Sequence, residues 1–87
     1  MYKLAQHVSK VQTDYGVVLL DEVRGVYFTL NPSGVIVLDS VLDSGDLTSA
    51  VAALLSEYEV ERAVAEEDAA GVLRDLLSAG VVVPSGS

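Results

Sequence analysis

Apolar residues fall in short runs through the first thirty positions, a pattern typical of β-strands rather than helices. A loose alternation over 5–13 predicts a first strand, and the apolar run at 16–20 predicts a second strand that is largely buried on both faces. The stretch 26–30 consists of β-branched and aromatic residues followed by a leucine, which suits a third strand. Short polar turns join the three stretches, so the sequence predicts a three-stranded antiparallel meander.

The apolar spacing changes to that of a helix immediately after residue 30. Asn31 is a good N-cap, and Pro32 suits the first helical position because its missing N–H would have no partner there. We therefore predict a helix over 32–44, with Gly45 as the residue that ends it.

Two further helices follow from apolar stripes at helical spacing, one over about 47–58 and one from about 62 to 79. Gly80 is expected to end the last helix. The valines at 81–83 predict either a short strand or a cover for the core, and 84–87 is expected to form a flexible tail.

Three strands followed by three helices predict an α+β domain of the winged helix-turn-helix type, with the helices at 32–44 and 47–58 forming the helix-turn-helix pair. The 87 residues are enough for one domain, and we expect a single unit over 1–87.

The net charge of −8 is confined to the helical part of the chain. Residues 1–30 hold three cationic and three acidic side chains, whereas 31–87 hold two arginines against ten acids. Such a surface repels a phosphate backbone and tolerates a neutral or basic polypeptide. The simpler alternative is that the excess acid only keeps the protein in solution.

The helix-turn-helix outline suggests DNA binding, but the residues of the second helix argue against it. The stretch 49–57, where a recognition helix would lie, has no Lys, Arg, Asn or Gln to contact bases or phosphates. We therefore expect no nucleic-acid partner.

No pattern in the chain predicts catalysis, a cofactor or a metal. His7 is the only histidine and has no nucleophile or carboxylate at a productive spacing, and there is no cysteine for a disulfide or a thiolate ligand. The carboxylates at 57–61 and 66–68 lack the spacing of a calcium loop. A chain of this size with one histidine and no cysteine is not expected to be an enzyme. No apolar run approaches the length of about 20 residues that spans a bilayer, and the N-terminus has no signal region, so we expect a cytoplasmic protein.

The third strand, 26–30, has one hairpin neighbour in the predicted meander, so its other side is expected to be free. An extended peptide can add to such an edge, and the third helix beside it would form a groove. Glu67 and Asp68 could contact a cation or a backbone N–H there. The alternative for Phe28, Leu73 and Leu76 is that they belong to the core. The full set of candidate binding residues is Val26, Tyr27, Phe28, Thr29, Leu30, Glu67, Asp68, Ala69, Val72, Leu73 and Leu76.

Three segments together resemble the PqqD-like family of RiPP precursor peptide recognition elements. They read VLLD at 18–21, GVYFTLNPSG at 25–34, and Asp68 followed by LRDLLSAGVV at 73–82. Each motif is weak alone, but their order and their spread over nearly the whole chain make the combination specific. As a short, acidic, free-standing chain, it looks most like the B1 proteins of lasso peptide biosynthesis.

The resemblance implies a non-catalytic winged-helix protein that binds the leader of a precursor peptide as an extra strand on 26–30. The leader would be of the Tyr-x-x-Pro type and would be presented to a separate B2-like, cysteine-protease-like leader peptidase before a cyclase closes the ring. Position by position, the resemblance places the groove wall at Asp68, Ala69, Val72, Leu73 and Leu76.

One departure from the family is Ala69-Ala70-Gly71, where bulkier residues are usual. Small side chains there would either deepen a pocket or weaken the helix. Three other functions stay open beside leader binding: a PqqD-type chaperone for another modifying enzyme such as a radical enzyme, a winged-helix DNA-binding protein, and a piece of a larger modification enzyme.

Overall fold

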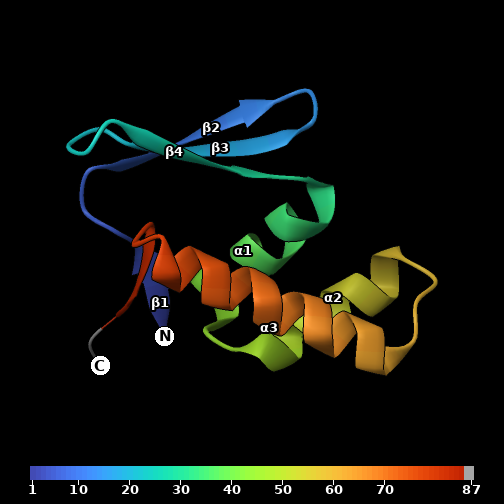
Figure 1. The fold of residues 1–87 in the computed structure, drawn as a ribbon. Helices are drawn as coiled ribbons and strands as arrows, with labels where there is room; N and C mark the ends of the chain where they lie inside the picture. The colour runs from blue at the N-terminus through green and yellow to red at the C-terminus, as the bar shows by residue number, and fades with distance from the viewer. Residues whose placement is uncertain (86–87) are drawn as a thin grey trace.

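The computed structural model describes residues 1–85. These residues form five strands and three helices. Figure 1 shows how they are arranged. They are β1 (Tyr2–Leu4), β2 (Val8–Thr13), β3 (Gly16–Asp21), β4 (Val26–Leu30), α1 (Pro32–Ser44), α2 (Leu47–Glu57), α3 (Arg62–Ser78) and β5 (Val82–Pro84).

The predicted meander is confirmed as the antiparallel sheet β2-β3-β4. In its register Val17 lies opposite Leu30 and Asp21 opposite Val26. The first strand is shorter than predicted, because 5–7 forms the connection from β1 instead. His7 adopts a positive φ of 71° in that connection, a conformation that a regular strand does not contain.

A second sheet pairs β1 with β5, and its N-terminal strand was not expected from the sequence. Tyr2 of β1 lies opposite Pro84 of β5, and the N–H of Ser85 donates to the carbonyl oxygen of Met1 at 2.8 Å. Of the valines at 81–83, Val82 and Val83 therefore belong to a strand, and Val81 and Val82 are buried in the core. The first two residues of the expected tail are paired in this way, and Gly86 and Ser87 lie outside the described residues.

The boundaries of α1 follow the predicted capping residues. The Asn31 side-chain oxygen accepts hydrogen bonds from the N–H of Gly34 and from the Ser33 hydroxyl, at 2.9 and 3.0 Å. Gly45 ends α1 in the left-handed conformation, with φ at 80°. The carboxylate of Asp46 then caps α2 by accepting from the N–H of Ser49.

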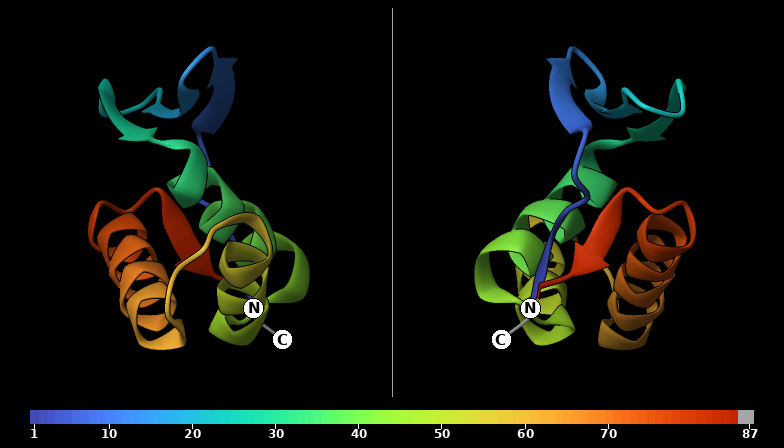
Figure 2. Two further views of the ribbon diagram at one scale, coloured as in Figure 1. Left: turned by 90° about the vertical axis from the view of Figure 1, so that its right-hand side faces the viewer. Right: turned by 90° about the vertical axis from the view of Figure 1, so that its left-hand side faces the viewer.

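The sheet β2-β3-β4 lies at one end of the molecule, and the helices are gathered on one of its faces, as both views in Figure 2 show. Val17, Leu19 and Leu30 of that face pack against α1, the end of α3 and β5. A second cluster fills the space between the three helices and includes Val51 and Ala65. The predicted α+β class is confirmed, and the arrangement is compatible with a winged helix. None of the helices within residues 1–85 is long and apolar enough to cross a membrane.

Candidate functional site

The predicted free edge is present on β4. Within residues 1–85, β4 pairs with β3 on one side and with no strand on the other. Unpaired N–H and C=O groups on an edge strand are a template for another extended chain. Val26 and Tyr27 on this strand are exposed by 48% and 71%, so its first half is open to solvent.

A hollow of about 360 Å³ lies between this edge and α3. Phe28 and Thr29 contribute from β4, and Val72 and Asp75 contribute from α3. The predicted groove between the third strand and the third helix therefore exists at this point. The complete lining is Phe28, Thr29, Leu30, Asn31, Gly34, Val72 and Asp75.

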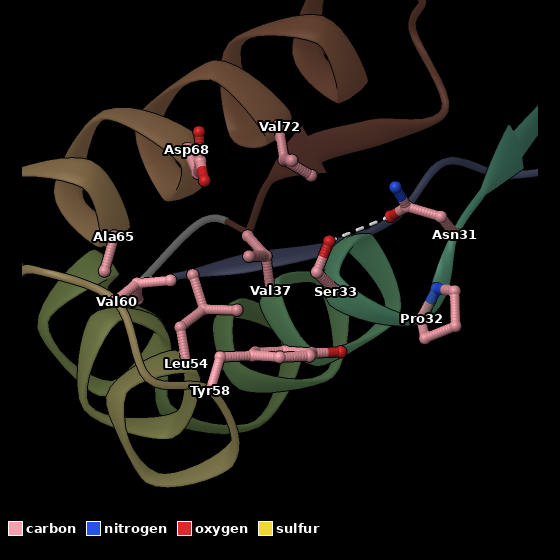
Figure 3. Close-up of a pocket in the computed structure, with 10 residues that line it drawn as sticks. All are labelled: Asn31, Pro32, Ser33, Val37, Leu54, Tyr58, Val60, Ala65, Asp68 and Val72. Atoms are coloured by element: carbon pink, nitrogen blue, oxygen red, sulfur yellow. Dashed lines mark hydrogen bonds between the residues drawn. The ribbon is translucent and has the colours of Figure 1, made fainter.

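A second hollow of about 310 Å³ lies between the start of α1, the end of α2 and α3 (Figure 3). Asp68 and Val72 lie on its α3 side, and the Tyr58 ring lies across from them. The complete lining is Asn31, Pro32, Ser33, Val37, Leu54, Tyr58, Val60, Ala65, Asp68 and Val72. Because Asn31 and Val72 line both hollows, the two adjoin, and together they are called the groove below.

Only some of the predicted site residues line the groove. Phe28, Thr29, Leu30, Asp68 and Val72 line the groove. Leu30 also reaches into the core and is 7% exposed, whereas Phe28 is half-buried. Of the others, Val26 and Tyr27 lie on the exposed edge of β4 and Glu67 is exposed on α3, and none of these three lines the groove.

The predicted groove wall on α3 needs correction at three positions. Ala69, Leu73 and Leu76 are 0%, 6% and 0% exposed and belong to the core clusters, so they fix α3 to the rest of the protein. The helix turns the 65–69–73–76 stripe toward the core, which leaves the 68–72–75 stripe to face the groove. The alternative that Leu73 and Leu76 are core residues is thus the correct one.

Several residues that line the groove are not among those predicted from the sequence. Asp75 lies seven positions after Asp68 and three after Val72, a spacing that predicts one helix face, so this signal was available. Tyr58, which the sequence placed at the end of the second helix, and Val60 lie in the link after α2.

The small residues at 69–71 do not deepen the groove. Ala69 is buried, and Gly71 lines neither hollow. A Cβ added at Gly71 would meet only the Nη2 atom of Arg74, at 3.7 Å. Of the two predicted consequences, a weaker helix is therefore the one that this geometry favours.

The groove offers binding surfaces rather than reacting groups. Its ionisable side chains are Asp68, Asp75 and Tyr58, and His7 lies elsewhere on the chain, exposed and outside the lining. Within residues 1–85, no three His, Cys, Asp or Glu side chains are grouped so that they could hold a metal ion.

The carboxylate of Asp21 stabilises the turn that leads into β4. Asp21 is buried and accepts hydrogen bonds from the N–H groups of Val23 and Arg24, both at 3.0 Å. The Arg24 backbone and side-chain hydrogen bonds hold the pKa of Asp21 below its ordinary value, and the partial loss of water opposes them.

The chain was compared with known proteins. The family model described as "Coenzyme PQQ synthesis protein D (PqqD)" matches residues 16–82. Among curated proteins there is no significant match. Two solved structures match over nearly the whole chain.

The first is described as "Lasso peptide synthetase B1 complexed with the leader peptide". It is 38% identical, with a TM-score of 0.86 over 95% of this chain and 98% of that one. The second, "TbiB1 in Complex with the TbiA(beta) Leader Peptide", is 29% identical, with a TM-score of 0.80 over 98% and 99% of the two chains. Together with the family model, these similarities show that the chain belongs to the PqqD family, as the resemblance in its sequence predicted.

Proposed function

We propose that this chain is a non-catalytic module that binds the leader segment of a ribosomally made precursor peptide. The leader adds as a strand to the free side of β4 and lays alternate side chains into the groove beside α3. The observation that carries the proposal is the unpaired edge of β4 directly beside the groove, in a chain that resembles two proteins solved with leader peptides.

The energetics explain why the groove matters as much as the edge. Each ladder hydrogen bond contributes about 0.5–1.5 kcal/mol net. Ordering a disordered segment costs about 2–5 kcal/mol, so four or five such bonds do little more than offset it. Useful affinity then comes from apolar side chains in the hollows, at about 1.5–3 kcal/mol for each large one that is buried.

The bound leader is then presented to a separate B2-like leader peptidase in lasso peptide biosynthesis, before a cyclase closes the ring. The family match keeps a second candidate, a PqqD-type chaperone that serves another modifying enzyme. Both use the same groove and differ in the enzyme that follows. Cleavage of the precursor by a separate B2-like leader peptidase distinguishes them: acceleration by the chain supports the first, and an unchanged rate supports the second.

The binding test is a calorimetric titration of the whole chain with a synthetic Tyr-x-x-Pro leader. Val72 lines both hollows and is half-buried, so Val72→Asp should weaken binding by about tenfold or more. Phe28→Ala should weaken it as well, because the ring forms the strand side of the groove. Leu73→Asp is unsuitable, because it places a charge in the core and would test folding.

Val64→Asp is the matched control, because Val64 lies on the same helix, is 45% exposed and lines neither hollow. It should bind the leader as the original chain does. Circular dichroism establishes that all three variants are folded. Absence of binding at tens of micromolar, or equal losses for Val72→Asp and Val64→Asp, would overturn the proposal.

A further inference from the structure

The face that α3 turns to the groove carries an ordered set of side chains. Asp68, Val72 and Asp75 follow one another at helical spacing, and all three line the groove. Asp75 lies in the hollow beside Phe28 and Thr29 of β4, whereas Asp68 lies in the hollow that continues toward α2. An apolar residue is thus flanked by two carboxylates on the wall that a bound peptide would face.

Neither carboxylate is neutralised by a close cation. The ion pairs found within residues 1–85 do not include Asp68, and the one at Asp75 is a 3.8 Å contact with Arg74. Both members of that pair are largely in solvent, at 75% and 61% exposure, where such contacts are weak. No Lys, Arg or His contributes to the lining of either hollow. The groove therefore has negative charges beside apolar walls, which concentrate the field of those charges.

The spacing of the two carboxylates suits an extended peptide. Seven residues of helix place Asp68 and Asp75 about 10 Å apart along the axis. A strand rises about 3.3 Å per residue, so that distance corresponds to about three residues of the peptide. Lys and Arg have long, flexible side chains, so one at either of two nearby positions could reach a carboxylate.

We propose that the groove selects leaders with Lys or Arg at one or both of two leader positions about three residues apart, which lie opposite Asp68 and Asp75. These two carboxylates are its specificity-determining residues. This inference rests on the proposed function, because it assumes that a leader occupies the groove. Excess acid that serves only to keep the chain in solution would act through net charge alone. Glu67 separates the two explanations, because it has the same charge on the same helix, is exposed and lies outside the groove lining.

The experiment starts from the synthetic Tyr-x-x-Pro leader of the binding test. All its Lys and Arg residues are replaced by Gln, and then a single Lys, Gln or Glu is placed at each position in turn. Affinities are measured by fluorescence anisotropy for the original chain and for Asp68→Asn, Asp75→Asn and Glu67→Gln, at about 50 mM and about 500 mM NaCl.

We expect Lys to bind about two- to fivefold more tightly than Gln at one or two positions within a span of about four residues, and Glu to bind more weakly there. Asp75→Asn and Asp68→Asn should each abolish the Lys preference at the leader position that lies opposite that carboxylate, whereas Glu67→Gln should preserve the preference at both positions. High salt should reduce the preference.

Equal affinities for Lys, Gln and Glu at every position would overturn this inference and leave leader binding standing. A Lys preference of the same size at every position, reduced equally by all three variants, would also overturn it, because that result indicates net charge alone. Failure of every peptide in the set, with the starting leader included, would overturn the proposed function together with the inference.

Discussion

The guanidinium of Arg24 donates from Nη2 to the carbonyl oxygen of Ala79 at 2.7 Å, and so connects the β3–β4 turn to the end of α3. Its Nε donates to Asp21 at the same time, also at 2.7 Å. The strand and the helix that border the groove are therefore joined at one end by a single side chain, which helps to set the distance between them.

Arg24→Lys should loosen this connection. An ammonium group cannot reproduce two hydrogen bonds that leave the guanidinium in different directions. We expect a loss of about 0.5–1.5 kcal/mol in the free energy of unfolding, measured by urea denaturation, together with weaker leader binding. Arg74→Lys is the control and should leave stability unchanged, because Arg74 is largely in solvent. Equal stabilities of the Arg24→Lys variant and the original chain would contradict the prediction.

Stability should fall in acid because of Asp21. Its pKa lies below the ordinary value of 3.8 in the folded chain, so the unfolded chain binds more protons between those two values. The contribution is complete above the ordinary value and is lost as the pH falls through the lowered pKa. Urea midpoints from about pH 6 to about pH 3 should record this decline.

The Asp21→Asn variant should be less stable at neutral pH and should show a shallower decline. Asp46 should account for part of the remainder, because the N–H of Ser49 also lowers the pKa of this capping carboxylate. A decline of unchanged steepness in Asp21→Asn would show that other groups are responsible.

Gly71→Ala should stabilise the protein by about 1 kcal/mol, because glycine is a poor residue for a helix interior and the added methyl group has room. Gly34→Ala is the matched comparison in α1. There the methyl group would come within 2.9 Å of Leu30 Cδ2 and 3.2 Å of Asn31 Oδ1, so we expect a loss instead. Thermal unfolding of the two variants should give shifts of opposite sign.

Gly16 and Gly25 should respond very differently to alanine. A Cβ at Gly16 would lie 1.9 Å from the carbonyl oxygen of Leu30, and φ there is 151°. A Cβ at Gly25 would have no neighbour within 4 Å. Gly25→Ala should therefore lower the free energy of unfolding only because alanine is disfavoured in the left-handed conformation, by about 1–2 kcal/mol. In urea denaturation, we expect Gly16→Ala to lose clearly more free energy of unfolding than Gly25→Ala. Similar losses would contradict the close approach of Gly16 to the Leu30 carbonyl oxygen.

Strand addition makes a prediction about the leader itself. In an antiparallel or parallel ladder, only every second residue of an added strand directs its backbone groups toward β4. N-methylation at successive leader positions should therefore weaken binding in an alternating pattern. Uniform effects along the leader, or none, would indicate a bound conformation other than a strand.

Local signals in the sequence determined most of the secondary structure. Residues 16–30 carry strand-forming side chains between polar turns, and Asn31 with Pro32 marks a helix start, so both features depend only on near neighbours. The free edge of β4 followed from the order of the meander, because 26–30 is the last of its three strands. The family resemblance also rested on residues that can be recognised in order along the chain.

Only the tertiary structure decided which face of α3 meets the groove. Leu73 and Leu76 are buried whereas Val72 and Asp75 line the groove, although all four are plausible from helical spacing. The pairing of β1 with β5 was equally invisible, because each strand has three residues and its partner is at the other end of the chain. Helix periodicity reports how side chains are spaced around an axis; the rotation of that axis depends on the packing of distant segments, which no local pattern contains.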